Sequence, residues 1–146
     1  MDEMRDDHGR RRLTDHEREE LLGLPLTAIF STLTAEGRIH SVPVHFLPTQ
    51  GEFRILTEPD SEKSRNARRS GRATLCVETT IGGNDRRYVS AEGSVSIEQP
   101  PSAEDLAALG RRYDWYEGQE GEPAADAGSV MLVLLPERVI AWSDAD

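Results

Sequence analysis

The chain has 146 residues, a single cysteine and a formal net charge of −10 at pH 7. This length fits one domain that needs no metal, and a lone Cys76 excludes an internal disulfide framework, so a cytoplasmic location is expected. The acidic balance argues against nucleic acid as a partner, and no apolar run approaches the ~18 residues that span a membrane.

The N-terminal segment is strongly charged. Asp, Glu and Arg dominate residues 1–13, so we predict a flexible arm there and a single domain over residues 14–146. Thr14 and Glu17 have the spacing of a capping box, in which each side chain accepts the backbone N–H of the other residue. This spacing predicts a short helix up to about Leu22.

After this helix, short segments rich in β-branched and aromatic residues are separated by turns. In Arg87–Ile97, the alternation places Val89, Ala91 and Val95 on one face and polar side chains on the other. Gly82–Asp85 predicts a tight hairpin turn before this strand. We expect strands at residues 27–34, 38–47, 53–57, 72–79, 87–97 and, bent at Pro136 and fully buried, 130–135 with 139–142.

Two further helices are expected, at about residues 61–70 and 102–112. Residues 113–128 contain five acids and no base, which is typical of a solvated loop. Several short antiparallel strands about ten residues apart favour a barrel over alternating βαβ units.

Positive charge is concentrated in one place. The twelve residues from Ser61 to Arg72 hold five cations and one acid, Glu62. The cations are Lys63, Arg65, Arg68, Arg69 and Arg72. Lys63 is the chain's single lysine, and its compact ammonium suits a phosphate. A local excess of this size in an acidic chain indicates a small anionic ligand.

The same segment begins a helix. Backbone amides at a helix N-terminus lack intrahelical acceptors and carry the positive end of the dipole. Ser61 adds a hydroxyl, Lys63 adds a charge, and Asn66 lies one turn further on the same face. These residues are compatible with a phosphate site, and the residues alone favour an ordinary solvated helix slightly.

Other chemistry is weakly indicated. His40 and His45 are five residues apart on a strand, so they face opposite sides and cannot share a metal. Cys76 is expected to be structural, and Trp142 is expected in the core or in a dimer interface. No motif of covalent catalysis and no protein-bound metal is expected.

Four passages together resemble a known family. They are Ala28–Leu33 with Gly37–Arg38, Ser41–Val44, Thr57–Asn66 and Arg87–Gly93. In this order and spacing the chain resembles the flavin and deazaflavin oxidoreductases of the pyridoxamine phosphate oxidase-like split-barrel superfamily. The resemblance implies a mainly β fold with flanking helices, a six-stranded antiparallel split β-barrel that binds FMN in many members.

The resemblance also implies a site. Ser41, Val42 and Pro43 would lie along the cofactor ring. The cofactor's phosphate would be bound by Thr57, Ser61, Lys63, Arg65 and Asn66. Tyr88 is a candidate substrate orienter or proton donor, with cross-strand packing as its alternative role. The superfamily places its cofactor between two subunits, which implies a homodimer.

One residue departs from the oxidase pattern. Glu62 stands where the oxidases proper have arginine, and an inward-facing acid would repel a phosphate. Lys63 and Asn66 followed by Arg68 and Arg69 are closer to the branch that binds the deazaflavin coenzyme F-420, whose anionic tail the arginines would face. We expect hydride transfer between F-420 and a small unsaturated or heteroaromatic substrate. The alternatives are an FMN-dependent oxidoreductase, a non-catalytic flavin- or haem-type binding protein, and an acidic interaction domain without a cofactor.

Overall fold

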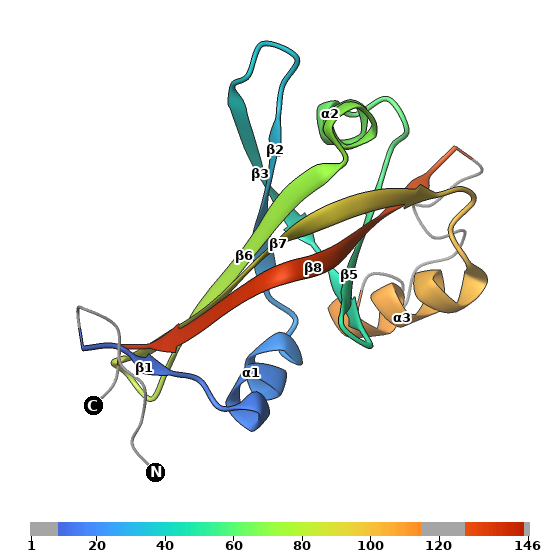
Figure 1. Cartoon of the computed structure of the whole chain (residues 1–146). Coiled ribbons are helices and arrows are strands. Elements are labelled where there is room, and N and C mark those ends of the chain that lie inside the picture. The colour runs from blue at the N-terminus through green and yellow to red at the C-terminus, as the bar shows by residue number, and fades with distance from the viewer. Residues whose placement is uncertain (1–8, 115–127, 145–146) are drawn as a thin grey trace.

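The protein is described by a computed structural model that covers residues 9–114 and 128–144 (Figure 1). Its elements follow the chain as β1 (Arg11–Arg12), α1 (Asp15–Leu22), β2 (Thr27–Leu33), β3 (Ile39–His45), β4 (Leu47–Thr49), β5 (Glu52–Thr57), α2 (Glu62–Ser70), β6 (Arg72–Ile81), β7 (Asp85–Glu98), α3 (Ala103–Tyr113) and β8 (Val130–Ser143). Among these, no helix is both long and apolar enough to cross a membrane.

All strands belong to one antiparallel sheet with the order β3-β2-β6-β7-β8-β5-β4, and β1 pairs with β8. Six of them have at least six residues, which confirms the expected strands, and β1 and β4 are short additions. The sheet curls around the long β7 and β8 so that β3 and β5, far apart in strand order, approach each other (Figure 1). This half-barrel with flanking helices is the predicted fold class.

The core fills the concave side of the sheet. Val89, Ala91 and Val95 are buried, as the alternation in Arg87–Ile97 predicts, and they pack with Phe30 and Leu75 from neighbouring strands. Because side chains alternate along a strand, the residues between them face the outer side. A second cluster, built around Leu109, Met131 and Val133, packs α3 against the other end of β8.

Residues 1–8 of the expected flexible arm lie outside the described residues, and residues 11–13 lie against the sheet. Arg11 and Arg12 pair with Ser143 and Trp142 of β8, and Leu13 is buried. The pairing is possible because the end of β8 extends past β5 and leaves an edge for β1 to join. The capping box at Thr14 is present, and α1 ends at Leu22, both as predicted.

Gly93 fixes the bend of the two longest strands. The β7–β8 register shifts between Glu92 and Gly93, opposite Pro136. A Cβ on Gly93 would lie 2.0 Å from the carbonyl oxygen of Leu135, so only glycine fits. The predicted bend of the last strand at Pro136 is therefore a bulge inside one continuous strand. The strand is not fully buried as expected, because Leu135 and Val139 are exposed.

Tyr113 was expected in a solvated loop, and it instead closes α3. Its hydroxyl accepts the N–H of Phe46 at 3.0 Å and lies 2.8 Å from the carbonyl oxygen of Leu26. His45 stacks on its ring, with 4.1 Å between centroids. These contacts hold α3 against the β3–β4 corner, and residues 115–127 of the expected loop lie outside the described residues.

Candidate functional site

The start of α2 is shaped by a chain of hydroxyl groups. Thr57 donates to Ser61 at 3.0 Å, Ser61 donates to Ser64 at 2.9 Å, and Ser64 donates to the carbonyl of Glu58 at 2.8 Å. Ser61 also accepts the N–H of Ser64 as the N-cap. Thr57 and Ser61 therefore form the turn itself. The amides of Glu62 and Lys63 stay without intrahelical acceptors, as in any first helical turn.

Lys63 lies in this turn as a half-buried cation. Burial lowers the pKa of its ammonium, and the nearby Glu58 partly opposes that shift. Within the described residues, no carboxylate makes an ion pair with Lys63. A desolvated cation without a fixed counterion is costly, so the site favours an anion that supplies one.

Glu62 is turned toward β3. Its Oε2 lies 3.6 Å from Nε2 of His40, and the His40 Nδ1 is buried without a hydrogen-bond partner in the described part of the chain. The acid that departs from the oxidase pattern is thus held beside an imidazole. Sequence reasoning missed this role of His40, because the packing of α2 on β2, where Thr32 pairs with His40, brings the two side chains together.

Asn66 has a different position from the one expected. It is buried, its Nδ2 donates to Thr32 Oγ1 at 3.0 Å, and its Oδ1 accepts from Arg69 at 3.3 Å. The amide therefore fastens α2 to β2. Its predicted phosphate contact would require both bonds to be exchanged, so we assign it a positioning role.

The arginines of α2 fold back onto the protein. Arg65 and Arg68 donate to the carbonyl groups of Asp60 and Pro59, and Arg69 donates to that of Leu33. The expected cationic surface for a cofactor tail is therefore largely engaged with backbone. Arg65 covers the turn before α2 and does not join Lys63 in an open anion site.

Two strand edges without a pairing partner in the described chain lie near this turn. β3 pairs along one edge with β2, and the end of β5 pairs along one edge with β8, so among the described strands their other edges carry no ladder. Ser41 hydrogen-bonds Ser31 at 2.7 Å on the outer face, Val42 packs on the core and Pro43 is exposed. These three residues would therefore contact a planar ring through the unpaired backbone edge of β3.

Tyr88 does not belong to this site within one chain. It pairs with Trp142 and accepts a hydrogen bond from Arg10 at 3.0 Å, at the β1 end of the sheet. Thr57, which belongs to the turn before α2, pairs with Val130 at one end of β8, whereas Trp142 lies at the other end. Tyr88 of the same subunit therefore lies away from Lys63, and its role as a catalytic residue stays a prediction.

Metal binding finds no support in the geometry. His40 contacts Glu62, whereas His45 stacks on Tyr113 and burial lowers its pKa. In the described ranges no three His, Cys, Asp or Glu side chains gather as a metal site would require.

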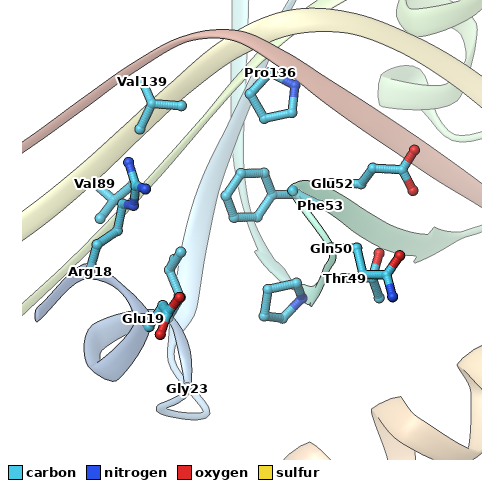
Figure 2. A pocket seen from close by; sticks show the side chains of 13 residues that line it. Arg18, Glu19, Gly23, Thr49, Gln50, Glu52, Phe53, Val89, Pro136 and Val139 are labelled. Carbon is cyan, nitrogen blue, oxygen red and sulfur yellow. The ribbon is translucent and has the colours of Figure 1, made fainter. Parts of the chain in front are cut away.

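A separate hollow of about 540 Å³ lies between α1 and the β4–β5 turn. Figure 2 shows Phe53, Pro136 and Val139 along it, with Arg18 and Glu19 of α1 at one side. None of the residues predicted to bind a cofactor lines it. The candidate site is therefore the start of α2 together with the free edge of β3.

A curled antiparallel sheet with a helix N-terminus beside its open edge is the architecture of the pyridoxamine phosphate oxidase-like split barrels. Residues 14–143 match the family model for pyridoxamine 5'-phosphate oxidase. The chain belongs to this family, whose superfamily includes oxidoreductases and flavin-binding proteins. A comparison with curated proteins finds no match.

Solved structures share the fold. An F420 reductase is 26% identical, with a TM-score of 0.69 over 83% of this chain and 94% of its own. An FAD-binding protein of Mesorhizobium loti is 18% identical, with a TM-score of 0.72 over 93% and 99%. The haem storage protein HutZ of Vibrio cholerae is 16% identical, with a TM-score of 0.67 over 88% and 94%.

Proposed function

We propose that the protein is an oxidoreductase that binds coenzyme F-420 and transfers a hydride between it and a small unsaturated or heteroaromatic molecule. The observation that carries the proposal is Lys63, a half-buried ammonium with no ion pair in the described chain, placed among the first-turn amides of α2. These groups together fit a phosphate.

The charge of the site favours F-420 over FMN. FMN carries a phosphate monoester with a charge near −2, whereas F-420 carries a phosphodiester with one charge. The site offers one ammonium, and the Glu62 carboxylate lies in the same helical turn. A singly charged phosphodiester therefore meets less repulsion here. The likeness to an F420 reductase supports the same choice.

Each part of the site has a defined task in this proposal. Lys63 and the amides of α2 bind the phosphate, the hydroxyl chain from Thr57 to Ser64 keeps the turn in shape, and Asn66 holds the helix in place. The free edge of β3 aligns the ring. When bound, the deazaflavin supplies the hydride chemistry. The protein positions substrate over the ring and limits water, and solvent supplies the proton.

We further propose a homodimer with the cofactor at the subunit interface. Ile29, Leu33 and Ile39 are 45%, 48% and 74% exposed on the outer face of β2 and β3. Alternation places them opposite the buried side chains of the same strands. An apolar face of this kind beside the free edge of β3 supports association there.

Fluorescence titration with F-420 and with FMN tests the cofactor. We expect saturable F-420 binding that is tighter than FMN binding, and a loss of about 10- to 100-fold in affinity for Lys63→Ala because a charge-assisted contact disappears. Arg65→Ala is the matched control, since that guanidinium is engaged by Asp60, and it should change affinity little. Equal affinities of wild type and Lys63→Ala would refute the phosphate assignment.

An assay of F-420 oxidation distinguishes an enzyme from a cofactor-binding protein without catalytic activity. Reduced F-420 should be oxidised by at least one member of a panel of enones, quinones and nitro-heteroaromatic compounds. Tight cofactor binding without reduction of any acceptor would indicate a non-catalytic flavin-binding protein. Tighter binding of haem than of F-420 or FMN would indicate a haem-binding protein.

A further inference from the structure

A second basic region lies at the end of the sheet remote from α2. A cleft of about 400 Å³ opens between β1, the start of α1 and β8. Its charged lining consists of Arg12, Arg18, Arg138 and Asp15, a formal +2 in a chain of −10. Its apolar wall is formed by Leu13, Val139, Ile140, Ala141 and Trp142. We call it the Arg12 cleft.

Arg12 is placed by the pairing of β1 with β8. Alternation sends Arg11 toward Glu17, with 2.8 Å between Nη1 and Oε1, and sends Arg12 toward the other side. There the Arg12 guanidinium carbon lies 5.7 Å from the centre of the Trp142 ring. A guanidinium over an aromatic face keeps its in-plane N–H groups available for a bidentate contact with an oxyanion.

Arg138 adds a second available guanidinium. It is exposed on β8, and its cross-strand neighbour Glu92 lies 4.0 Å from Arg72 instead. In the described part of the chain neither Arg12 nor Arg138 makes an ion pair, whereas Arg18 is paired with Asp15 at 3.3 Å. The +2 charge of the cleft is therefore carried by two guanidinium groups without counterions.

Other arginines of the described chain also lack an ion pair, but they do not border this cleft. Those of α2 donate to backbone carbonyl groups, and Arg54 and Arg87 lie in ion-pair networks with neighbouring carboxylates. Arg12 and Arg138 differ because they border a cleft that also contains an indole ring. Fork-shaped donors, an aromatic wall and a compact volume are the features of a small-molecule oxyanion site.

We propose that the Arg12 cleft binds a small molecule with two or more phosphate or carboxylate groups. Arg12 and Arg138 each bind one oxyanion, and the ligand's body lies against Trp142. This site is separate from the cofactor site at Lys63 and does not depend on it.

Trp142 provides a direct readout. The chain has two tryptophans, so Trp115→Phe leaves Trp142 as the single indole. Pyrophosphate and citrate are titrated into this protein at constant ionic strength, as the phosphate and carboxylate probes. We expect a saturable change in fluorescence with at least one probe, and the stronger one identifies the ligand chemistry. Inorganic chloride at the same ionic strength should give no saturation.

Variants in the same background locate the site. Arg12→Gln and Arg138→Gln should each weaken binding about tenfold or more, and Arg138→Lys should weaken it less than Arg138→Gln because it keeps the charge without the fork. Arg111→Gln, at an exposed arginine of α3, is the matched control and should leave affinity unchanged. Lys63→Ala should also leave it unchanged.

Three results would overturn the proposal: no saturation with either probe, an equal loss in Arg111→Gln, or unchanged affinity in Arg138→Gln. Arg12→Gln could weaken the pairing of the two-residue β1. Arg138 lies on the 14-residue β8, so Arg138→Gln tests the site without that effect. Unfolding curves of each variant identify any loss of affinity that comes from a loss of fold.

Discussion

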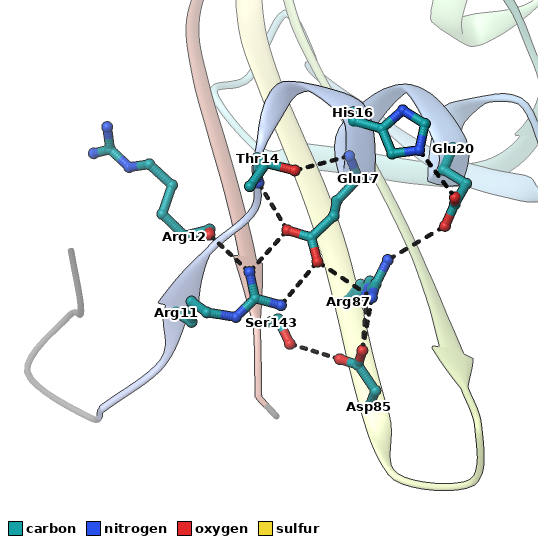
Figure 3. A network of polar contacts seen from close by, with 9 residues as sticks. All are labelled: Arg11, Arg12, Thr14, His16, Glu17, Glu20, Asp85, Arg87 and Ser143. Carbon is teal, nitrogen blue, oxygen red and sulfur yellow. Dashed lines mark hydrogen bonds and ion pairs between the residues drawn. The ribbon is translucent and has the colours of Figure 1, made fainter. Parts of the chain in front are cut away.

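The side chains of Glu17 and Lys63 are both partly buried. Glu17 forms ion pairs with neighbouring arginines, whereas Lys63 forms none within the described residues. Figure 3 shows Glu17 between Arg11 and Arg87, with Asp85 and Ser143 completing the network. The two Arg11–Glu17 contacts measure 2.8 and 2.9 Å. The Arg11 hydrogen bonds lower the pKa of Glu17 from 4.5 to about 2, against the opposing effect of burial. Lys63 has no such carboxylate partner among the described residues, which is why we propose a phosphate ligand for it.

Glu17 should make the fold sensitive to acid. Its carboxyl pKa is lower in the folded protein than in the unfolded chain, so the stabilisation is complete above about pH 4.5 and is lost as the pH falls toward 2. Glu17→Gln should lower the free energy of unfolding at pH 7 by about 2–3 kcal/mol and flatten its dependence on pH in that window. Urea unfolding between pH 3 and 7 measures both effects.

Glu19→Gln on the same helix is the control for this experiment, because Glu19 is exposed and has no such network. A pH profile of Glu17→Gln that parallels the wild type would show that other carboxylates control acid unfolding.

At the scale of elements, the pairing of β7 with β8 determines the curvature of the sheet. Each strand has 14 residues, and their register shifts at Gly93 and Pro136, where the two backbones come close. The bend lets one end of β8 pair with β5 and the other end pair with β1. The site at α2 and the Arg12 cleft are therefore both positioned by the same strand.

Replacing Gly93 by alanine should strongly destabilise the protein. The new Cβ would meet the carbonyl oxygen of Leu135 at 2.0 Å, and backbone cannot move aside as a flexible side chain would. We expect a loss of about 3 kcal/mol or more in the free energy of unfolding, measured with urea. Gly23→Ala, where the closest atom is the Glu19 carbonyl oxygen at 3.3 Å, should change stability by about 1 kcal/mol at most. Similar losses for both variants would contradict this account of the bulge.

At the scale of the whole molecule, the concave side of the sheet is filled by the core and the outer side stays partly apolar. Cys76 belongs to this outer surface, and it lies beside Ile29 on the neighbouring strand. It is half-buried, and burial raises the pKa of its thiol, which supports the expected structural role.

The proposed dimer is tested by Ile39→Asp. We expect the wild type to sediment as a dimer and the variant as a monomer, because a carboxylate at the most exposed of the three apolar positions would be buried unpaired. F-420 affinity should fall with the dimer. Leu24→Asp alters an exposed leucine before β2 and should leave the dimer intact. A monomeric wild type across the working concentration range would exclude an interface cofactor site.

Local chemistry allowed much of this protein to be predicted from its sequence. The capping box at Thr14, the αL glycine that ends α2, the hairpin before β7 and the period-two alternation of that strand each depend on neighbouring residues. The family resemblance followed from the same kind of signal, and so did the candidate site at the start of α2, since Lys63 and Ser61 are close in sequence.

Contacts between distant residues were decided by the tertiary structure. Asn66 donates a hydrogen bond to Thr32, 34 positions away in the sequence, and so holds α2 against β2. The short strand β1 pairs with β8, although composition alone indicated a flexible arm. Charge counting placed the cationic surface on α2, where the arginines are engaged with backbone, while Arg12 and Arg138 are left without counterions in the described chain. The sequence alone determines how many charged residues the protein has. Strand pairing and helix packing determine which of them form ion pairs, because the partners are distant in sequence.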